Sequence, residues 1–458
     1  MNKFLCKITA SILILALCFS FSGCNSIDNN PEESNKLTYY AVAKDYIWDV
    51  DEFRSTRAYD IDMFEKYNAY CELNDNDDYK IEIIYFDTPD EMYAKLSTEI
   101  MAGRGPDIFS SCQILPFEKL VQGQTLADID ELIDMYDYDI GLNDCNQAVM
   151  DAGVIDGKRF FLPLTFTPDV SITTEKTLEK YNLTPENFSF DALSKQLSSS
   201  GEAFSLFGNE VCNTSFFYSF LDRYIDFNKG EAEFETAEFS DNLDSITYLI
   251  QNDTTDENLY YFLPENINNG ACVLYKDGSS VQTVVRTCAL IRNLGGDPAI
   301  VSDYIREKDV LSGRVDYSLS FNKNSQHKEK LLAFAKYCLS DEVQAKLDYF
   351  VIGSLPVKIT VFEQLIEEIQ PTDFNDDGVI DENERAVFQN ACDSELTEYL
   401  DIINNTSEYQ LNNFYDLPKS YFNSSVIGDI VDDYLSGAIS KNKFIIRLTA
   451  ATEIYLTE

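Results

Sequence analysis

The segment from Tyr93 to Phe109, YAKLSTEIMAGRGPDIF, constrains the fold most, because it predicts a helix that leads directly into a buried strand. Apolar residues at positions 92, 96, 100 and 101 have helical spacing, and Gly103, Gly105 and Pro106 end the helix. A short strand then begins at Asp107. The polar residues that follow would lie at the carboxyl end of this strand, where open α/β sheets bind their ligands.

Strand-like and helix-like runs alternate around this segment. Residues 37–42 and 79–86 predict strands, and a helix is expected around 61–70. This βαβαβ order predicts a parallel sheet covered by helices. Residues 159–164 predict a strand that crosses into a second, helix-rich region at about 165–295. Helices are expected there at 216–225 and 239–250, and later in the chain a strand at 317–321 and a helix at 328–339.

The amino terminus predicts a processing segment. Lys3 and Lys7 flank an apolar run from 8 to 21 that is too short to span a bilayer. The run ends Phe21-Ser22-Gly23-Cys24, which resembles a lipobox and predicts acylation of Cys24; an unlipidated secretory signal or a structural Cys24 are the alternatives. We therefore expect a signal peptide over 1–23, a flexible tether over 24–36, and a lipid anchor on the outer face of the bacterial cytoplasmic membrane.

Composition narrows the possible partners. The 458 residues carry 79 acidic and 35 basic side chains, a formal net charge of −44, which disfavours nucleic acid as a partner. A cationic solute is compatible with this charge, but a simple acidic surface explains it as well. Eight cysteines follow Cys24 without any C-x-x-C motif, so we expect mostly buried thiols and at most one or two disulfides. They are Cys71, Cys112, Cys145, Cys212, Cys272, Cys288, Cys338 and Cys392.

Residues 373–384, DFNDDGVIDENE, match the twelve-residue calcium loop of EF-hands. Oxygen donors fall at every ligand position, and Gly378 occupies the position of the sharp turn. The predicted ligands are Asp373, Asn375, Asp377, the carbonyl of Val379, Asp381 and Glu384. No second loop is present and Pro371 disfavours a regular entering helix, so we expect a structural calcium ion rather than a sensor. A solvated acidic loop is the alternative.

Catalytic motifs are absent from the sequence. His327 is the only histidine and lies in a Lys- and Gln-rich stretch, which favours an exposed residue over a general base or a zinc ligand. No P-loop, G-x-S-x-G or G-x-G-x-x-G motif occurs. The sequence therefore predicts a binding protein rather than an enzyme.

Several segments together resemble the extracellular solute-binding proteins, family 1, of ABC importers. The first is the helix ending A-G-R-G-P-D-I-F described above. The others follow in the order expected for the family: Asp156-Gly157-Lys158 before Phe161-Leu162-Pro163, Asn269 to Val273, FNKNSQHKEKLLAFAKYCLSDEVQ over 321–344, Gly353 to Val357, and the carboxyl-terminal tail. Together they cover residues 37–458.

The resemblance implies a two-lobed, periplasmic-binding-protein-like (type 2) α/β fold with several hinge crossings. Lobe 1 would comprise 37–160 and 300–355, and lobe 2 would comprise 161–299 and 356–458, with the calcium loop in lobe 2. It also implies solute contacts at Ser110, Ser111, Gln113, Thr165, Thr167, Asn213, Phe216, Asp277, Ser279 and Ser280. Tyr46 and the single Trp48 follow the first strand, where their rings could stack on a sugar; core packing is their alternative role.

We therefore predict a lipid-anchored, monomeric receptor that captures a small solute, a mono- or oligosaccharide, and delivers it to ABC permease subunits. The single tryptophan puts a long oligosaccharide in doubt, although 28 tyrosines could replace it. The alternatives are a peptide or a polyamine on the same scaffold, an anchored glycoside hydrolase or lyase, or a calcium-stabilised adhesion module.

Overall fold

The computed structural model describes residues 35–42, 56–111, 117–207, 210–226, 231–254, 264–276, 280–302, 311–347, 354–374, 377–411 and 424–457. The chain divides into two units, Met1–Lys36 and Leu37–Glu458. Only Asn35 and Lys36 of the first unit are described, so the predicted signal peptide and Cys24 lie outside the described residues. The architecture below is that of the second unit.

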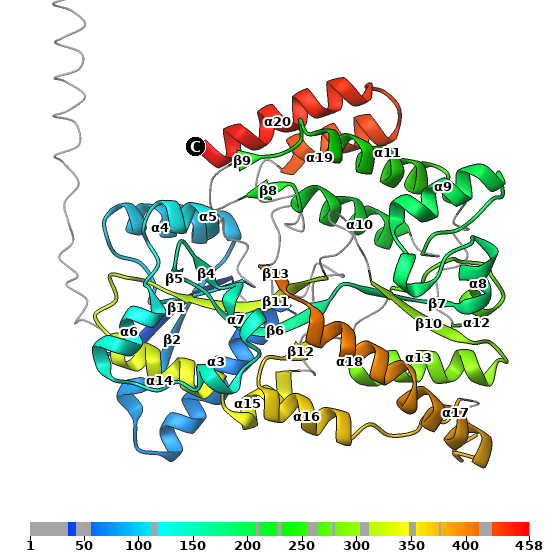
Figure 1. Ribbon diagram of the computed structural model, residues 1–458. Helices are drawn as coiled ribbons and strands as arrows, with labels where there is room; N and C mark the ends of the chain where they lie inside the picture. The colour runs from blue at the N-terminus through cyan, green and yellow to red at the C-terminus, as the bar shows by residue number, and fades with distance from the viewer. Residues whose placement is uncertain are drawn as a thin grey trace, which may run out of the picture. The chain divides into compact units, whose positions relative to one another are not determined.

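The first lobe is built on two parallel strands, β1 (Leu37–Val42) and β2 (Ile81–Phe86), as the sequence predicts. Successive residues of β1 face opposite sides of the sheet. Tyr39 packs with Phe64 of helix α3 (Thr56–Leu73), whereas Tyr40 belongs to a separate core with Met92 and Leu96 of helix α4 (Pro89–Met101). Helices thus cover both faces of this sheet (Figure 1).

The A-G-R-G-P-D-I-F motif forms the joint between helix α4 and the strand that follows it. Gly103 and Gly105 have φ of +69° and +118°, which favours glycine. The Asp107 carboxylate accepts from the backbone N–H of Thr38 at 2.8 Å and from the Ser325 hydroxyl at 2.5 Å, so it fastens β1 to a later turn. The strand that follows, β3 (Ile108–Ser110), pairs antiparallel with β11 rather than parallel with β1, which corrects the simple βαβαβ sheet.

Two long strands connect the lobes, and we call them the crossing strands: β6 (Leu162–Pro168) and β11 (Ser312–Phe321). They pair antiparallel with each other. The same sheet holds β12 (Leu355–Pro356) beside β6 and β13 (Glu408–Leu411) beside β11. The β6 chain continues as β7 (Val170–Thr174), which pairs with β10 (Pro298–Ser302) (Figure 1). The first crossing therefore begins three residues later than the predicted 159–164 strand.

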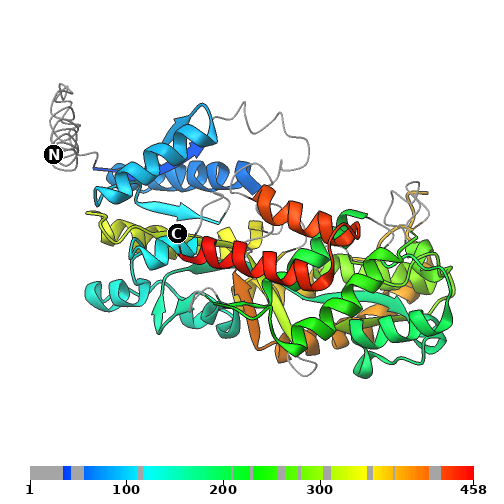
Figure 2. The same cartoon turned by 90° about the horizontal axis from the view of Figure 1, so that it is seen from above.

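The second lobe contains a helical core. Helices α9 (Phe190–Ser200), α10 (Glu210–Asp222) and α11 (Ala237–Gln251) pack with the carboxyl-terminal helices α19 (Ser424–Leu435) and α20 (Lys441–Thr457) (Figure 2). Thr247 of α11 bonds the Tyr434 hydroxyl of α19 at 3.1 Å. The predicted 216–225 helix ends earlier, at Asp222, because the chain turns into strand β8 (Ile225–Asp226), paired with β9 (Glu231–Ala232).

A third group of helices extends the core of the crossing strands. Helices α13 (Val281–Asn293), α17 (Glu382–Asp393) and α18 (Glu395–Asn405) share one continuous core with β1, β6 and β11. The Arg292 guanidinium of α13 binds the Glu395 carboxylate of α18 through Nε at 3.1 Å and through an additional Nη2 contact. Glu395 is 2% exposed, so this ion pair fastens the helices together at the edge of the core.

The remaining elements are short or peripheral. They are η1 (Asp77–Tyr79), α5 (Phe117–Gln122), α6 (Ile129–Tyr136), η2 (Leu142–Asp144), α7 (Gln147–Asp151), β4 (Val154–Ile155), β5 (Lys158–Arg159), α8 (Glu175–Lys180), η3 (Pro185–Asn187), α12 (Pro264–Asn268), α14 (Lys328–Cys338), α15 (Asp341–Leu347) and α16 (Ile359–Glu367). Helix α14 matches the predicted helix over 328–339 within one residue.

Candidate solute-binding site

The crossing strands have one apolar and one polar face. Gly313 lies against Tyr409 of β13, since a Cβ there would approach its ring to 2.5 Å, and Phe166 packs edge-on to the same ring at 5.3 Å. Alternate residues point to the other side. We call the residues there the polar crossing face: Thr167, Asp169, Ser312, Arg314 and Asp316.

Asp316 joins three elements on this face. Its Oδ2 accepts from the Thr167 hydroxyl at 2.5 Å and from the Ser354 hydroxyl, just before β12, at 2.6 Å. Its Oδ1 accepts from Arg314 Nε at 2.7 Å. The Asp316 side chain is 8% exposed, whereas that of Arg314 is 39% exposed, so solvent reaches the arginine and not the carboxylate.

Asp169, at the joint between β6 and β7, is the second buried carboxylate. It forms an ion pair with Arg223, which follows α10, and accepts from the Ser312 hydroxyl at 2.9 Å. Burial alone would raise the pKa of Asp169, but the charges of Arg223, Lys276 and Arg314, with the Ser312 hydrogen bond, lower it below the ordinary value. Asp169 is therefore ionised at neutral pH, and three cations lie close enough to stabilise that charge.

A third buried carboxylate, Asp60 of α3, lies in the first lobe and is held by hydroxyl groups. Tyr39 of β1 and Tyr317 of β11 each donate to it at 2.5 Å, and Ser110 of β3 donates at 2.8 Å. Asp60 is 2% exposed. This carboxylate therefore fixes the first turns of α3 against three strands, beside the edge where solute contacts are predicted.

The structure places the predicted contact residues unevenly. Ser110 is fully buried on Asp60, Ser111 is half-buried and its hydroxyl accepts from the Ser318 N–H at 2.9 Å, and Thr165 is fully buried in β6. Phe216 packs against Phe190 and Phe207 in the second core.

Among the remaining predicted contacts, Thr167 lies on the polar crossing face, and Ser280 caps α13 by accepting from the Thr283 N–H at 3.2 Å. Asn213 belongs to α10, but only its backbone is described. Tyr46, Trp48, Gln113, Asp277 and Ser279 lie outside the described residues. As solute contacts, all of these residues stay predictions.

The sequence analysis missed the charged residues of this region. Among the many charged residues of the chain, no motif distinguishes Asp60, Asp169, Arg223, Arg314 and Asp316. A signal was present: Ser312-Gly313-Arg314-Val315-Asp316 alternates polar and apolar residues, as a strand with one polar face does. The pairing of this strand with β6 could not be predicted from one sequence, so its charges could not be assigned to a common face.

In the predicted calcium loop, carboxylates accept hydrogen bonds from backbone N–H groups of the described residues. Asp373 Oδ2 accepts from the Gly378 N–H at 2.7 Å, and the Glu384 carboxylate accepts from the N–H groups of Phe374 and Asp381 at 2.8 and 2.9 Å. Among the described residues, no cluster of three or more His, Cys, Asp or Glu side chains could hold a metal ion, and Asn375 lies outside them. Asp377 and Val379 are exposed at the loop surface, and Asp381 caps α17.

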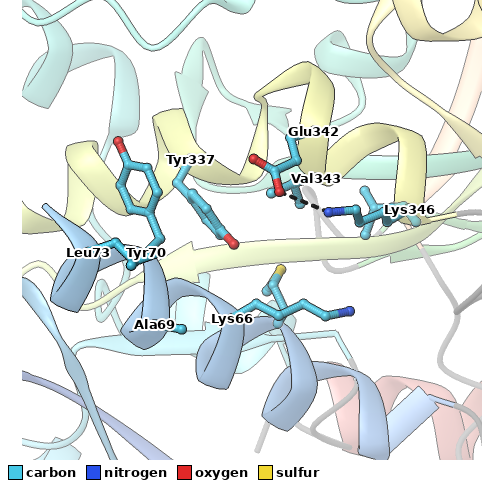
Figure 3. A pocket seen from close by; sticks show the side chains of 10 residues that line it. Lys66, Ala69, Tyr70, Leu73, Tyr337, Glu342, Val343 and Lys346 are labelled. Carbon is cyan, nitrogen blue, oxygen red and sulfur yellow. Dashed lines mark hydrogen bonds and ion pairs between the residues drawn. The ribbon is translucent and has the colours of Figure 1, made fainter.

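A separate hollow lies on the outer side of the first lobe, between α3 and the α14–α15 pair. Its volume is about 270 Å³, and the rings of Tyr70 and Tyr337 stand beside it, 5.1 Å apart (Figure 3). Lys346, paired with Glu342 at 2.9 Å, lies at its other side. None of the predicted contact residues that the structure describes lines this hollow.

Of the described cysteines, Cys71, Cys145, Cys272, Cys288, Cys338 and Cys392 are free thiols. Five of the six are buried, which agrees with the expectation of small apolar core residues. Cys112 lies outside the described residues, and only the backbone of Cys212 is described.

Comparison with known proteins identifies the class. Residues 61–345 match the model of the bacterial extracellular solute-binding protein family, which is more than half of the chain. The chain belongs to this family. Its members are extracytoplasmic binding proteins rather than enzymes, and their partners are a small-molecule solute and an ABC permease. None of the curated proteins matches the chain in sequence.

Solved structures share the two-lobed fold. A proposed oligosaccharide periplasmic-binding protein from Synechococcus sp. MITs9220 is 14% identical, with a TM-score of 0.56, over 92% of this chain and 99% of that one. The bacterial solute receptor AcbH, described as having an exclusive preference for β-D-galactopyranose, is 11% identical, with a TM-score of 0.51, over 91% of this chain and 98% of that one. At such identities the likeness establishes the α/β two-lobed fold.

In the part of the chain that the structure describes, no helix has the length and apolar character needed to cross a membrane.

Proposed function

We propose that this protein is the lipid-anchored receptor of an ABC importer that captures a mono- or oligosaccharide over the crossing strands. The observation that carries the proposal is the family match combined with a fold like that of proteins described as binding oligosaccharide and galactopyranose. Contacts from both lobes would favour a closed state in which the solute is held for delivery to the permease.

A solute screen tests this function. The full chain is titrated calorimetrically with saccharides, dipeptides and polyamines, and each mixture is then analysed for products by chromatography. We expect saturable binding of at least one saccharide without turnover. Binding confined to peptides or amines would contradict the carbohydrate class, and product formation would indicate an enzyme.

We also propose that Cys24 carries the lipid that keeps the receptor at the membrane. The charged start, the apolar run and the Phe21-Ser22-Gly23-Cys24 ending support this. Expression with radiolabelled palmitate should label the wild-type chain and leave Cys24→Ala unlabelled, with Cys392→Ala as the control that keeps its label. Equal labelling of wild type and Cys24→Ala would contradict it.

Calcium binding by residues 373–384 is proposed from the ligand spacing, and the Asp373–Gly378 hydrogen bond, which orders the loop around its turn, supports it. Asp373, Asn375, Asp377, Asp381 and Glu384 would supply side-chain oxygens, and Val379 would supply its carbonyl. Extracellular sites bind at about 10⁻⁴ to 10⁻³ M, so millimolar calcium should add about 1–2 kcal/mol of stability.

The calcium proposal is tested by thermal unfolding with 5 mM calcium or with a chelator. The melting temperature of the wild type should rise modestly with calcium, whereas that of Asp373→Ala/Glu384→Ala should not. Magnesium at the same concentration controls for ionic strength. An equal rise in the wild type and the double variant would refute the site.

A further inference from the structure

We propose that the captured solute is an acidic saccharide, and that Arg314 on the polar crossing face binds its anionic group. The inference rests on the proposed function and names the class of solute for that same site. A uronic acid, with one carboxylate on a sugar ring, is the simplest member of this class.

Cations from three separate elements converge on this face. Arg314 is on β11, Arg223 follows α10, and Lys276 follows Tyr275, which bridges to Ile172 of β7. All three act electrostatically on the buried Asp169. With the carboxylates of Asp169 and Asp316, these side chains bring three positive and two negative charges together. The chain as a whole has more than twice as many acidic as basic side chains, so a local excess of positive charge runs against its composition.

The two ion pairs of this face differ in their exposure. In the Arg223–Asp169 pair both side chains are 9% exposed, so this pair is part of the core. In the Arg314–Asp316 pair the arginine is 39% exposed while the carboxylate is 8% exposed. The hydroxyl groups of Thr167 and Ser354 also donate to Asp316. The carboxylate that orients Arg314 is therefore itself held in place.

Arginine suits a carboxylate of a solute at this position. The Asp316 bond uses Nε, and the planar guanidinium presents its donors in a fork that matches carboxylate geometry. Because Asp316 orients the side chain in advance, little side-chain entropy has to be lost on binding.

Lys276 places a further positive charge on the side of the second lobe. Its Nζ lies 5.9 Å from the centre of the Phe216 ring on α10. An anionic group bound at Arg314 would therefore be attracted to both lobes, which favours closure around a charged solute over a neutral one.

The test compares matched saccharides that differ only in charge. The full chain is titrated calorimetrically with galactose and galacturonate, with glucose and glucuronate, and with trigalacturonate and galactotriose. We expect an acidic member to bind about ten- to a hundredfold more tightly than its neutral partner, as a charge-assisted bond predicts. Raising the salt concentration from 50 to 500 mM should weaken only the acidic member.

Arg314→Gln should abolish this preference while leaving the melting temperature close to that of the wild type. Arg447→Gln is the matched control, since Arg447 pairs with Asp433 at 2.6 Å and is 36% exposed, on α20. It should keep the preference for acidic saccharides. The salt dependence of the wild type provides a test that needs no variant.

Equal or tighter binding of the neutral members would overturn the inference and leave the proposed function intact. A preference that survives in Arg314→Gln would also overturn it. If neither acidic nor neutral saccharides bind and peptides or amines do, the proposed function fails together with the inference.

Discussion

Two buried carboxylates, Asp60 in the first lobe and Asp169 at the crossing strands, are stabilised in opposite ways. The Asp60 carboxylate accepts hydrogen bonds from the hydroxyl groups of Tyr39, Ser110 and Tyr317. The Asp169 carboxylate forms an ion pair with Arg223 and lies near two further cations. Hydroxyl donors hold a carboxylate in place through hydrogen bonds, whereas cations also neutralise its negative charge.

The difference separates a fixed joint from the region where we propose that a charged solute is recognised. The Asp60 cluster connects α3 to strands β1, β3 and β11 through hydroxyl groups. The polar crossing face connects the lobes and leaves Arg314 within reach of solvent. Stability should therefore depend on both carboxylates, whereas solute selectivity should depend on the crossing strands.

Asp169→Asn should have the largest effect on stability. The substitution leaves Arg223 buried without its counter-charge, and breaking a buried pair costs about 3–5 kcal/mol of the free energy of unfolding. Urea unfolding followed by circular dichroism measures it. Asp433→Asn, which breaks the more exposed pair with Arg447, should cost less than about 1 kcal/mol. Equal losses would show that Asp169 is not a core ion pair.

Asp60→Asn should have a smaller effect, about 1–3 kcal/mol, because the amide can accept from some of the hydroxyls but places its N–H₂ against others. Tyr317→Phe, which removes a single donor, should cost less than Asp60→Asn in the same unfolding experiment. The affinity for a saccharide should change less in Asp60→Asn than in Arg314→Gln. The reverse order of affinities would place recognition at the first lobe.

The pH dependence of stability should reveal the contribution of Asp169. The folded pKa of Asp169 is lower than the unfolded value of about 3.9, so its contribution is complete above that pH and is lost as the pH falls through the folded pKa. In this window the wild type should lose up to about 1.4 kcal/mol per pH unit more than Asp169→Asn. If the free energies of unfolding of the wild type and Asp169→Asn changed in parallel between pH 5 and pH 2.5, this prediction would be wrong.

Arg314→Gln should have the smallest effect on stability, less than about 1 kcal/mol, because its side chain is more than one-third exposed and water screens the pair with Asp316. Chemical unfolding of this variant beside Arg447→Gln should give similar midpoints. A large loss in Arg314→Gln alone would mean that the arginine serves the fold rather than the solute.

Much of the fold could be predicted because local signals determine it. The bounds of β1 were predicted without error, and α14 within one residue, since alternation and helical spacing are encoded in neighbouring residues. The Gly103–Asp107 joint was also correctly predicted as a helix end followed by a strand. The antiparallel pairing of β3 with β11 was missed because its partners are about 210 residues apart in sequence.

The candidate site was less predictable, for a related reason. The position after a predicted strand indicates Ser110, and the family resemblance indicates Thr167 after the first crossing. The carboxylates that hold these two residues, Asp60 and Asp316, come from distant segments. Sequence position predicts where a hydroxyl lies along a strand, and only the tertiary pairing determines whether it faces a solute or a buried acid. The charge pattern of a site assembled from β6, β11 and α10 therefore required the structure.

A crystal structure of the protein with its tightest-binding saccharide tests the central claim most directly. The account predicts electron density for the sugar over the polar crossing face, with its anionic group within hydrogen-bonding distance of Arg314. A sugar bound elsewhere, for example in the hollow between α3 and the α14–α15 pair, with Arg314 still in contact with Asp316 and solvent, would contradict it.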